Sequence, residues 1–351
     1  MESEGYTHNL RRALPQTPLM DERFRALEAW LAAELGAPPR RIERASTDAS
    51  FRRYFRVFTD DGASRIAMDA PPERENSRAF VLVAGLMKDA GVHVPHVLAQ
   101  DLERGFLLLS DLGNRPYLAA LREGAPEKLL DDATTALVRW QAASRPGVLP
   151  EYDEALLRRE LDLFPEWYLG LYLGIELTGA QREALEGVFR RVLARNLAEA
   201  RVFVHRDFMP RNLMVCDPNP GVLDFQDAVL GPVSYDIACL MRDAFISWDE
   251  ERVLDVTIRY WEKARKAAIP VPADFGEFWR DVEWMGLQRH LKVLGIFARL
   301  CYRDGKCAYL EDTPRFVGYV RHAVERYIDL APLGALLDAA ERARPRPRPG
   351  A

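Results

Sequence analysis

The sequence predicts an α+β protein with two lobes, a small β-rich N-terminal lobe with one main helix and a larger helical C-terminal lobe. The first observation is size, because 351 residues with 48% hydrophobic composition are enough for two hydrophobic cores. The second is a group of short strand-like runs and turns between residues 51 and 110. The third is helical spacing of apolar residues over most of 117–330. Strands followed by helices in this order are typical of an α+β fold.

The small lobe is expected to cover residues 1–110. It begins with a helix over 21–35, in which Asp21 can cap the first turn and Gly36 ends the last one. Another helix is expected over 77–90. The strands expected in this lobe are residues 51–58, 65–69, 97–100 and 106–110.

A hinge at residues 111–114 should lead into the helical lobe, residues 115–335. A tail at 336–351, which ends in alternating Arg and Pro, is expected to be disordered. Pro165 should kink or end the helix in which it lies. The helices expected in this lobe are residues 126–143, 154–173, 178–195, 234–245, 249–266, 274–284, 287–302 and 313–330.

The chain is organised around residues 202–227, which read VFVHRDFMPRNLMVCDPNPGVLDFQD. This stretch holds three polar groups in a fixed order, Asp207, Asn212 and Asp224. An apolar run leads to Asp207, and two further apolar runs flank the turn DPNPG at 217–221. A strand, a turn and a strand of these lengths predict a hairpin. The hairpin would bring Asn212 and Asp224 together beside Asp207.

Two carboxylates and one amide in this order suit phosphoryl transfer, which depends on an acceptor held in line and on cations against the phosphate charge. Mg²⁺ prefers oxygen ligands, so Asn212 and Asp224 can hold it. Asp207 can then orient the acceptor hydroxyl and take its proton. The spacing fits H-R-D-x-x-x-x-N, with Asp224-Phe225-Gln226 in the place of D-F-G. The alternative is a surface hairpin rich in Asp and Asn.

These stretches resemble the aminoglycoside phosphotransferase branch of the protein-kinase-like fold. Within that branch, the chain is most similar to the bacterial N-acetylmuramate/N-acetylglucosamine anomeric sugar kinases of cell-wall recycling. The resemblance extends over residues 20–330. The runs that carry it are TDASFRRYFR at 47–56, MDAPP at 68–72, FPEWY at 164–168, VHRDFMPRN at 204–212, DFQDA at 224–228 and GPVSYD at 231–236.

The resemblance implies that ATP with Mg²⁺ donates its γ-phosphate to the anomeric C1 hydroxyl of N-acetylmuramate, N-acetylglucosamine or both. The sugar 1-phosphate would feed UDP-amino-sugar synthesis in peptidoglycan recycling. Two other functions stay open, an aminoglycoside or other small-alcohol phosphotransferase on the same fold and a catalytically dead kinase-like binding module. The implied nucleotide contacts are Ser46, Thr47, Asp48 and Ser50 in a phosphate-covering turn, and Leu109 and Leu112 near an adenine-contacting hinge.

One departure from the family pattern concerns the lysine that kinase-like folds place on the third strand to hold the phosphates. Aligning Ile66-Ala67-Met68-Asp69 with V-A-I-K puts Asp69 in the place of the lysine, and an acid cannot hold phosphate. We hypothesise that Arg52, Arg53 or Arg56 supplies the positive charge instead. Strand alternation points Arg52 and Arg53 to opposite faces, so at most one of these two should reach the nucleotide. The alternative is that all three are solvated strand arginines.

Four further residues are candidates for binding the acceptor. Sugars are held by aromatic faces together with fixed polar groups, so Trp167 or Tyr168 could face the sugar while Glu160 accepts a hydroxyl. The alternative for these three is helix packing. Arg211, next to Asn212, is a candidate for binding the transferring phosphate or a sugar acid, and the alternative is a salt bridge within the loop.

Three residues are expected to support the site. His205 is expected to be a buried, hydrogen-bonded support rather than an acid or base. Arg206 either pairs with a neighbouring carboxylate or covers surface. Asp227 is expected to support the metal ligands without touching the ion.

Charge and composition limit the partners. Acids and bases are mixed along the chain and the net charge is −5, so nothing favours nucleic acid or a membrane surface. The expected partner is a small-molecule acceptor, and no obligate protein partner is evident. Four cysteines lack metal-ligand spacing and are expected to be reduced thiols. The first twenty residues lack a basic start followed by an apolar run, and we expect a cytoplasmic protein.

Overall fold

The computed structural model describes residues 22–45, 51–124 and 126–343. The predicted phosphate-covering residues Ser46, Thr47, Asp48 and Ser50 lie outside this part of the chain. Contacts between Cα atoms divide the described residues into two compact units. The first unit holds residues 22–45, 51–78 and 96–111, and the second holds 79–95, 112–124 and 126–343.

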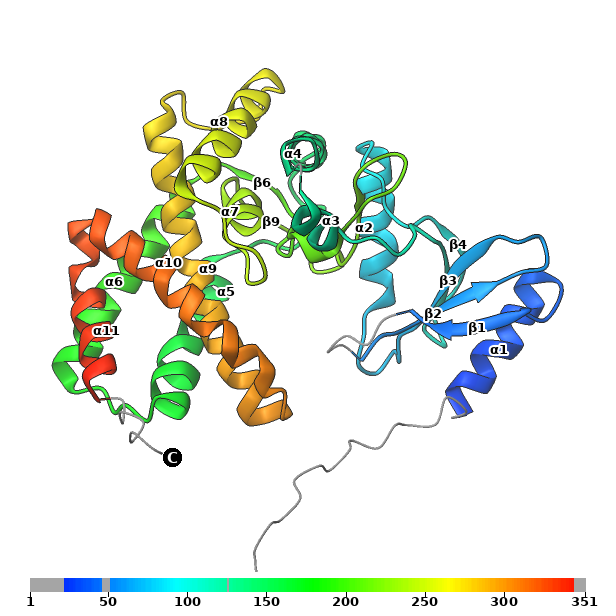
Figure 1. Cartoon of the computed structure of the whole chain (residues 1–351), viewed down its shortest axis with the longest axis horizontal. Helices are drawn as coiled ribbons and strands as arrows, with labels where there is room; N and C mark the ends of the chain where they lie inside the picture. Colours follow the sequence, from blue (N-terminus) through cyan, green and yellow to red (C-terminus); the bar gives the residue numbers. More distant parts are fainter. Residues whose placement is uncertain (1–21, 46–50, 125, 344–351) are drawn as a thin grey trace, which may run out of the picture. The chain divides into compact units, whose positions relative to one another are not determined.

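The first unit is an antiparallel sheet with a helix on one face (Figure 1). Its elements are α1 (Glu22–Leu35), β1 (Arg41–Arg44), β2 (Arg53–Phe58), β3 (Ser64–Asp69), β4 (Val97–Asp101) and β5 (Phe106–Ser110). The strands lie in the order β1-β2-β3-β5-β4. Strand β1 was not expected from the sequence, because its residues are mostly exposed and show no apolar alternation.

Alternation along β2 decides which side chains meet α1. Phe55 and Val57 are buried in one cluster with Phe24, Leu27 and Trp30 of α1. Residues two apart on a strand share a face, so the odd-numbered positions of β2 point toward α1 and the even-numbered ones point away from it. Arg53 therefore shares the face that α1 covers, whereas Arg56 lies on the other face of the sheet.

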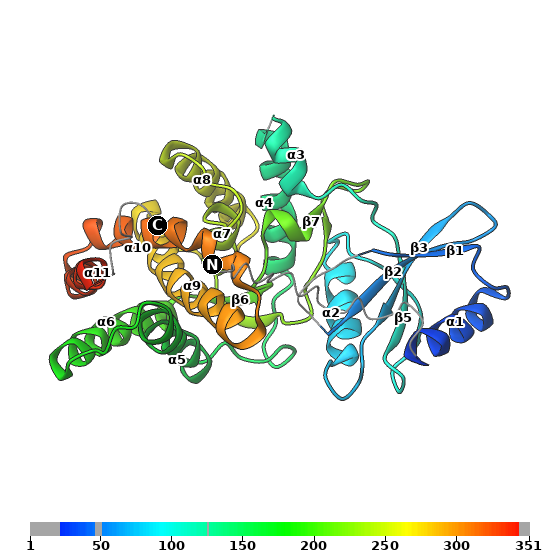
Figure 2. The same ribbon diagram turned by 60° about the horizontal axis from the view of Figure 1, so that its bottom comes forward.

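The second unit is mainly helical and contains two small two-stranded sheets (Figure 2). Its helices are α2 (Ser77–Asp89), of which the first two residues fall in the first unit, α3 (Tyr117–Glu123), α4 (Pro126–Ala142), α5 (Glu154–Leu163), the π-helix η1 (Phe164–Tyr172), α6 (Gly179–Ala198), α7 (Tyr235–Met241), α8 (Glu250–Lys266), α9 (Phe275–Asp304), α10 (Thr313–Arg326) and α11 (Ala331–Ala343). Short 3₁₀ turns are η2 (Pro210–Asn212), η3 (Cys307–Asp312) and η4 (Ile328–Leu330). The strands are β6 (Arg201–Val204), β7 (Leu213–Met214), β8 (Gly221–Val222) and β9 (Val229–Pro232).

Helix α9 is the element around which the second unit packs. It contacts η1, α5, α6, α7 and α10. Asp274 caps its first turn by accepting the N–H of Glu277 at 3.0 Å, and Gly305 ends it with φ 70°. The sequence predicted two helices here, at 274–284 and 287–302, and that division was wrong. Gly286 lies inside this helix without a positive φ, and a Cβ there would make only ordinary van der Waals contact with His290, at 3.4 Å.

The predicted hairpin is confirmed, because β7 and β8 pair antiparallel with Leu213 opposite Val222. Strand β6, which precedes it, pairs with β9 instead. The expected effect of Pro165 is also confirmed: α-helical hydrogen bonding ends at Leu163 and the chain continues as the π-helix η1. The α+β architecture predicted from the sequence is therefore the one observed.

The C-terminal segment differs from expectation. Residues 336–343 were expected to belong to a disordered tail but form the greater part of α11. Leu333, Leu336 and Leu337 are buried, and α11 contacts α6 and α10. The segment packs through this apolar face. The expectation of disorder extended the Arg-Pro composition of the following residues to a segment that has an apolar face. Residues 344–351 lie outside the described chain.

The cysteine prediction was wrong for one pair. Cys301, in the last turn of α9, and Cys307, at the start of η3, form a disulfide with Cα atoms 4.1 Å apart. The turn at Gly305 reverses the chain and brings the two residues together. Cys216 and Cys239 are free thiols.

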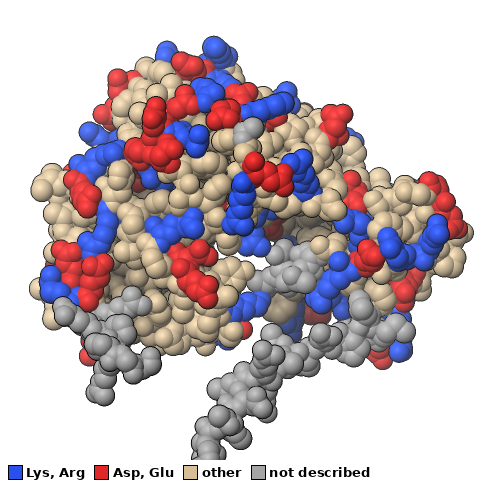
Figure 3. Space-filling model, viewed as in Figure 1, with Lys and Arg blue, Asp and Glu red and all other residues tan. Residues whose placement is uncertain are grey.

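Charged side chains of both signs are interspersed over the face seen in Figure 3, as the mixed sequence predicts. Among the described residues, no helix is long and apolar enough to span a bilayer.

Candidate active site

The buried carboxylate of Asp236 holds the backbone of the loop that carries Asp207. Strand β6 ends at Val204, and Asp236 of α7 accepts the backbone N–H of His205 at 2.7 Å and that of Arg206 at 3.0 Å. Arg206 adopts φ 77°, which is uncommon for any residue except glycine. Burial raises the pKa of Asp236 to about 7, although the two N–H groups oppose the rise. The loop therefore enters the site in a strained conformation that other groups must stabilise.

His205 links this loop to the end of the hairpin. It is fully buried, and Nε2 lies 3.0 Å from the carbonyl oxygen of Leu223, while the N–H of Asp207 donates to Nδ1 at 3.2 Å. Burial lowers the pKa of His205 to about 4, so the ring is neutral near pH 7 and Nε2 carries its proton. One imidazole thus fixes the backbone beside Asp207 and the backbone beside Asp224.

The three groups singled out in the sequence lie together. Asn212, at the end of η2, donates from Nδ2 to the carbonyl oxygen of Asp207 at 2.9 Å and reaches Oδ2 of Asp224 at 3.4 Å. Gln226 donates to Oδ1 of Asp224 at 2.9 Å and reaches Asp227 at 3.3 Å. Asp224 is exposed and adopts φ 62°, a conformation that Asp tolerates better than most residues. The cluster thus brings the amide of Asn212 and the carboxylate of Asp224 together at the backbone of Asp207, whose side chain is partly exposed.

Glu160 lies behind the loop rather than facing a ligand. Its Oε1 accepts from Arg206 at 2.6 Å and from Lys292 at 2.8 Å. Its Oε2 accepts from Gln288 at 3.2 Å and from the hydroxyl of Tyr152. Burial would raise the pKa of Glu160, but Lys292 and Arg206 outweigh it and hold the pKa at about 2. Of the two roles left open for Arg206, pairing with a carboxylate is the one observed. Glu160 has donors on both oxygens and is only 6% exposed.

Sequence reasoning missed three members of this cluster, Tyr152, Gln288 and Lys292. The last two lie on α9, more than 120 residues from Glu160. Gln288 and Lys292 lie four positions apart and so share one face of α9, and this spacing was the available signal. Nothing in the local sequence indicated their partner.

The aromatic candidates lie on η1. Tyr168 is buried and stacks on Phe164 with ring centroids 5.6 Å apart, whereas Trp167 is partly exposed. The structure therefore places Tyr168 in helix packing, which was the alternative given for it. Arg211 lies over the ring of Phe245, with its guanidinium carbon 4.9 Å from the ring centroid.

In the first unit, the arginines of β2 lie on different faces of the sheet and have different partners. Arg53 shares the α1 face and donates to Asp69 at 2.8 Å, and Arg23 of α1 donates to the same carboxylate at 3.0 Å. Asp69 is fully buried under α1. Asp69 is therefore a buried ion-pair partner of two arginines, a surrounding that the four-residue alignment did not indicate.

The two remaining arginines pair with other carboxylates. Arg56 donates to Asp111 at 2.6 and 3.1 Å, and Arg52 lies 2.8 Å from Glu75. Arg52 lies two residues after the turn predicted at 46–50, which is outside the described residues. Leu109 on β5 is buried, and Leu112, which falls in the second unit, is also buried.

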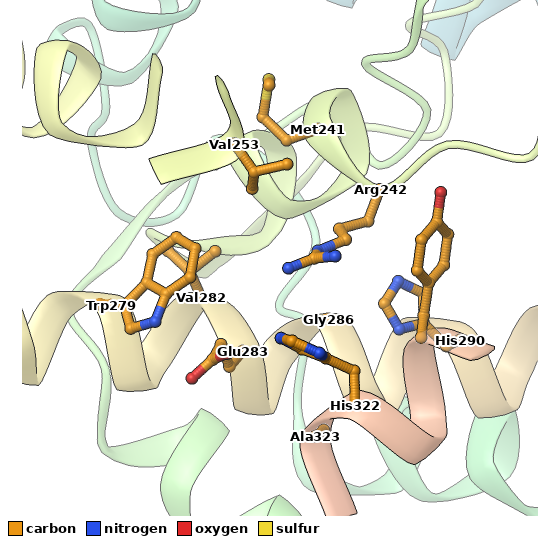
Figure 4. Close-up of a pocket in the computed structure, with 11 residues that line it drawn as sticks. Met241, Arg242, Val253, Trp279, Val282, Glu283, Gly286, His290, His322 and Ala323 are labelled. Atoms are coloured by element: carbon orange, nitrogen blue, oxygen red, sulfur yellow. The ribbon is translucent and has the colours of Figure 1, made fainter. Parts of the chain in front are cut away.

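A second cluster lies at a small pocket lined by α7, α8, α9 and α10 (Figure 4). The pocket encloses about 20 Å³, room for one water molecule. Ligand atoms of Glu250, Glu283 and His322 lie within 4.8 Å of one another beside it. Arg242 pairs with Glu250 at 2.6 Å and Arg326 with Glu283 at 2.5 Å, so arginines already neutralise both carboxylates. Ion pairs in this cluster join the four helices, and both carboxylates have arginine partners.

A model of the phosphotransferase enzyme family matches residues 41–274 of the chain. The chain belongs to this family. The match includes the hairpin with Asp207, Asn212 and Asp224, so the cluster described above lies in the part of the chain that defines the family.

Two relatives are similar to this phosphotransferase over nearly its whole length. An N-acetylmuramate/N-acetylglucosamine kinase of Pseudomonas aeruginosa is 54% identical over 327 residues, covering 90% of this chain and 96% of the relative. A protein of the same name from Neisseria meningitidis serogroup B is 51% identical over 315 residues, covering 89% of this chain and 94% of the relative. The family resemblance predicted from the sequence is confirmed.

Solved structures show the fold. The ADP-bound crystal structure of an aminoglycoside phosphotransferase superposes with a TM-score of 0.59 at 15% identity, covering 85% of this chain and 98% of that one. A choline kinase from Streptococcus pneumoniae gives a TM-score of 0.58 at 12% identity, covering 85% and 99%. The phosphotransferase therefore has the two-lobed, protein-kinase-like α+β fold that the sequence predicts.

Proposed function

We propose that this phosphotransferase is an ATP-dependent sugar kinase that transfers the γ-phosphate of ATP to the C1 hydroxyl of N-acetylmuramate, N-acetylglucosamine or both. The observation that carries the proposal is 54% identity over 90% of the chain to a kinase named for these two sugars. The convergence of Asp207, Asn212 and Asp224 supports the reaction class independently of that relative.

Asp207 is the proposed base. Its main chain is fixed on both sides, by His205 through its N–H and by Asn212 through its carbonyl oxygen, so the backbone from which its carboxylate would meet an acceptor hydroxyl has a defined position. In this role it orients that hydroxyl toward the γ-phosphate and accepts its proton as the new bond forms.

The donor set at the hairpin fits Mg²⁺. Asp224 supplies a carboxylate that is exposed and held by Gln226, and Asn212 supplies an amide whose Nδ2 is used internally, which leaves its oxygen for a ligand. Bound there, Mg²⁺ would neutralise charge on the phosphates of the nucleotide. Asp227 is proposed to support this set through Gln226.

Nucleotide binding is proposed for Arg52, with Ser46, Thr47, Asp48 and Ser50 in the turn before it and Leu109 and Leu112 near the adenine. The location of Arg53 and Asp69 on the α1 face supports Arg52 over Arg53 for the phosphates. The proposed product, a sugar 1-phosphate, would enter UDP-amino-sugar synthesis during peptidoglycan recycling. A cytoplasmic location is proposed because the reaction consumes ATP.

A coupled assay of ADP release against N-acetylmuramate, N-acetylglucosamine and kanamycin tests the proposal. We expect turnover with one or both amino sugars, and ³¹P and ¹³C NMR should show coupling between phosphorus and C1 of the product. Turnover of kanamycin alone would favour an antibiotic kinase. ATP binding without turnover of any acceptor would favour a binding module.

A further inference from the structure

The hairpin that carries the proposed metal ligands is short. Strands β7 and β8 contain two residues each, so the ladder between them consists of two residue pairs. A two-stranded hairpin is at best marginally stable by itself in water. Asn212 directly precedes β7 and Asp224 comes two residues after β8. The positions of both ligands therefore depend on what the hairpin contacts outside its own strands.

Main-chain hydrogen bonds hold both sides of the hairpin. Beside β7, the N–H of Val215 donates to the carbonyl oxygen of Arg115 at 2.8 Å. Beside β8, the N–H of Val222 donates to the carbonyl oxygen of His93 at 2.8 Å. Helix α3 also contacts β7 and the turn η2, of which Asn212 is the last residue (Figure 2). The strands and the base of the hairpin are thus fastened to the same unit.

Asn219, in the turn between the strands, joins the tip of the hairpin to two helices. Its Nδ2 donates to the hydroxyl of Tyr117 on α3 at 2.6 Å and to Oδ2 of Asp132 on α4 at 2.7 Å. Tyr117 is fully buried, and its burial together with the charge of Asp132 raises its pKa, so the hydroxyl keeps its proton near pH 7. A carboxylate only accepts hydrogen bonds, so Asp132 determines which end of the amide faces it.

Helix α3 therefore holds the hairpin at both ends. Tyr117 meets the tip through Asn219, and the contact of α3 with η2 lies at the base, next to Asn212. A hairpin held at its tip and its base opens less often than one held at its base alone. The metal ligands are then already ordered when the ion arrives, and less binding free energy is spent on ordering them.

We propose that Asn219 is a positioning residue for the metal site: by fastening the turn to Tyr117 and Asp132, it keeps Asn212 and Asp224 in place for a divalent cation. The inference rests on the proposed function, in which those two residues hold Mg²⁺. Asn219 does not touch the ion in this role. It acts through the two short strands that separate it from the ligands.

The first measurement is ion binding in the absence of an acceptor. Mn²⁺ takes the same oxygen ligands as Mg²⁺, and electron paramagnetic resonance follows free Mn²⁺ as it is titrated into the protein with ADP. We expect Asn219→Ala to raise the dissociation constant for Mn²⁺ about tenfold, the lower end of the effect of losing an outer partner of a metal ligand. Asp217→Asn, in the exposed part of the same turn, is the matched control and should bind as the wild type does.

An exchange of the two side chains separates their hydrogen bond from their shape. Asn219→Asp places a carboxylate against Asp132 and should weaken Mn²⁺ binding at least as much as Asn219→Ala. The double variant Asn219→Asp/Asp132→Asn again sets one donor against one acceptor, and it should bind within about threefold of the wild type. The exposed pair of Asp132 with Lys128 is lost in this variant, which costs little.

Hydrogen exchange in the metal-free protein gives a readout that does not involve the ion. The N–H of Leu223 donates to the carbonyl oxygen of Asn212 at 2.9 Å and closes the base of the hairpin. In Asn219→Ala this amide and that of Val222 should exchange about tenfold faster, as expected when a hydrogen bond to a charged group is lost. Amides of α9 should keep their wild-type rates, whereas a general loss of stability would accelerate both sets.

Wild-type Mn²⁺ affinity in Asn219→Ala would overturn the inference, and so would a double variant that binds no better than Asn219→Asp. Equal acceleration of exchange in the hairpin and in α9 would overturn it as well. Asp224→Asn distinguishes this failure from that of the proposed function. If Asp224→Asn binds Mn²⁺ as tightly as the wild type, the metal assignment fails together with the inference. A loss in Asp224→Asn without one in Asn219→Ala overturns the inference alone.

Discussion

The carboxylate of Glu160 lies 2.6 Å from the guanidinium of Arg206, the residue that directly precedes the proposed base. Arg206 holds φ 77°, so its ion pair acts on a backbone position that would otherwise favour glycine. Glu160 also accepts from Lys292 at 2.8 Å, which brings α9 into the same network. Three elements distant in sequence therefore meet behind one strained residue.

We predict that Glu160→Gln lowers kcat by about tenfold or more and lowers the melting temperature, because two buried cations lose their counter-charge. The control is Glu166→Gln, an exposed glutamate on η1. Steady-state kinetics and thermal melting measure both effects. Unchanged kcat in a folded Glu160→Gln variant would show that the loop keeps its conformation without the pair.

The same residue gives a pH prediction. Folding lowers the pKa of Glu160 from 4.5 to about 2, so the unfolded chain binds this proton first as the pH falls. The stabilisation is present above pH 4.5 and is lost as the pH falls toward 2, up to about 3 kcal/mol for this shift. The difference in unfolding free energy between the wild type and Glu160→Gln should therefore shrink over that interval. A difference that stays constant from pH 5 to pH 2 would contradict the assignment.

A third prediction concerns Arg52 and Arg53, at the start of β2. Arg52→Gln should raise the KM for ATP about tenfold, with a smaller change in the KM for the sugar, because the side chain is proposed to meet phosphate. Arg53→Gln is the natural comparison, since Arg53 faces α1 and donates to Asp69. It should lower the melting temperature and leave the KM for ATP near the wild-type value. The opposite pattern would place Arg53 on the nucleotide.

The proposed base and metal ligands separate by their kinetic signatures. Asp207→Asn should lower kcat by about 10²- to 10⁴-fold, the usual contribution of a general base. Asp224→Asn should instead raise the Mg²⁺ concentration needed for half-maximal activity, which a Mg²⁺ titration at saturating ATP measures. Asp217→Asn, in the exposed turn between β7 and β8, controls for the loss of an acid from the hairpin. Equal Mg²⁺ dependence in Asp224→Asn and the wild type would remove Asp224 from the metal site.

The hairpin could be predicted because its information is local. Asp207, Asn212 and Asp224 lie within eighteen residues, and the turn between the strands is marked by two prolines and a glycine. The partners of Glu160 could not be predicted in the same way, since Lys292 is 132 residues away and reaches it only through the packing of α9 against α5. The sequence indicates which residues belong to a strand or helix, but tertiary packing determines which other residues they contact.

The surroundings of Asp69 could not be predicted for a related physical reason. A strand has two faces, and a four-residue alignment does not show which face is covered by a helix. Here α1 covers the face with Phe55 and Ala67, which buries Asp69 between two arginines. An N-terminal helix with an arginine on its apolar side was the only hint of this arrangement.

The last prediction concerns the disulfide between Cys301 and Cys307, which is unusual for a protein expected in the cytoplasm. The bond joins two residues six positions apart and so closes a short loop at the end of α9. The loop-closure entropy of a loop of this length predicts a stabilisation of about 2 kcal/mol. Reductant should therefore lower the melting temperature of the wild type by a few degrees, and Cys307→Ser should show the lower value with or without reductant. Cys216→Ser is the control, because Cys216 is a free thiol and the variant should keep the response to reductant. Mass spectrometry after alkylation without reductant decides whether the bond forms in the purified protein: alkylation of both Cys301 and Cys307 would show that the two thiols stay reduced, as the sequence led us to expect.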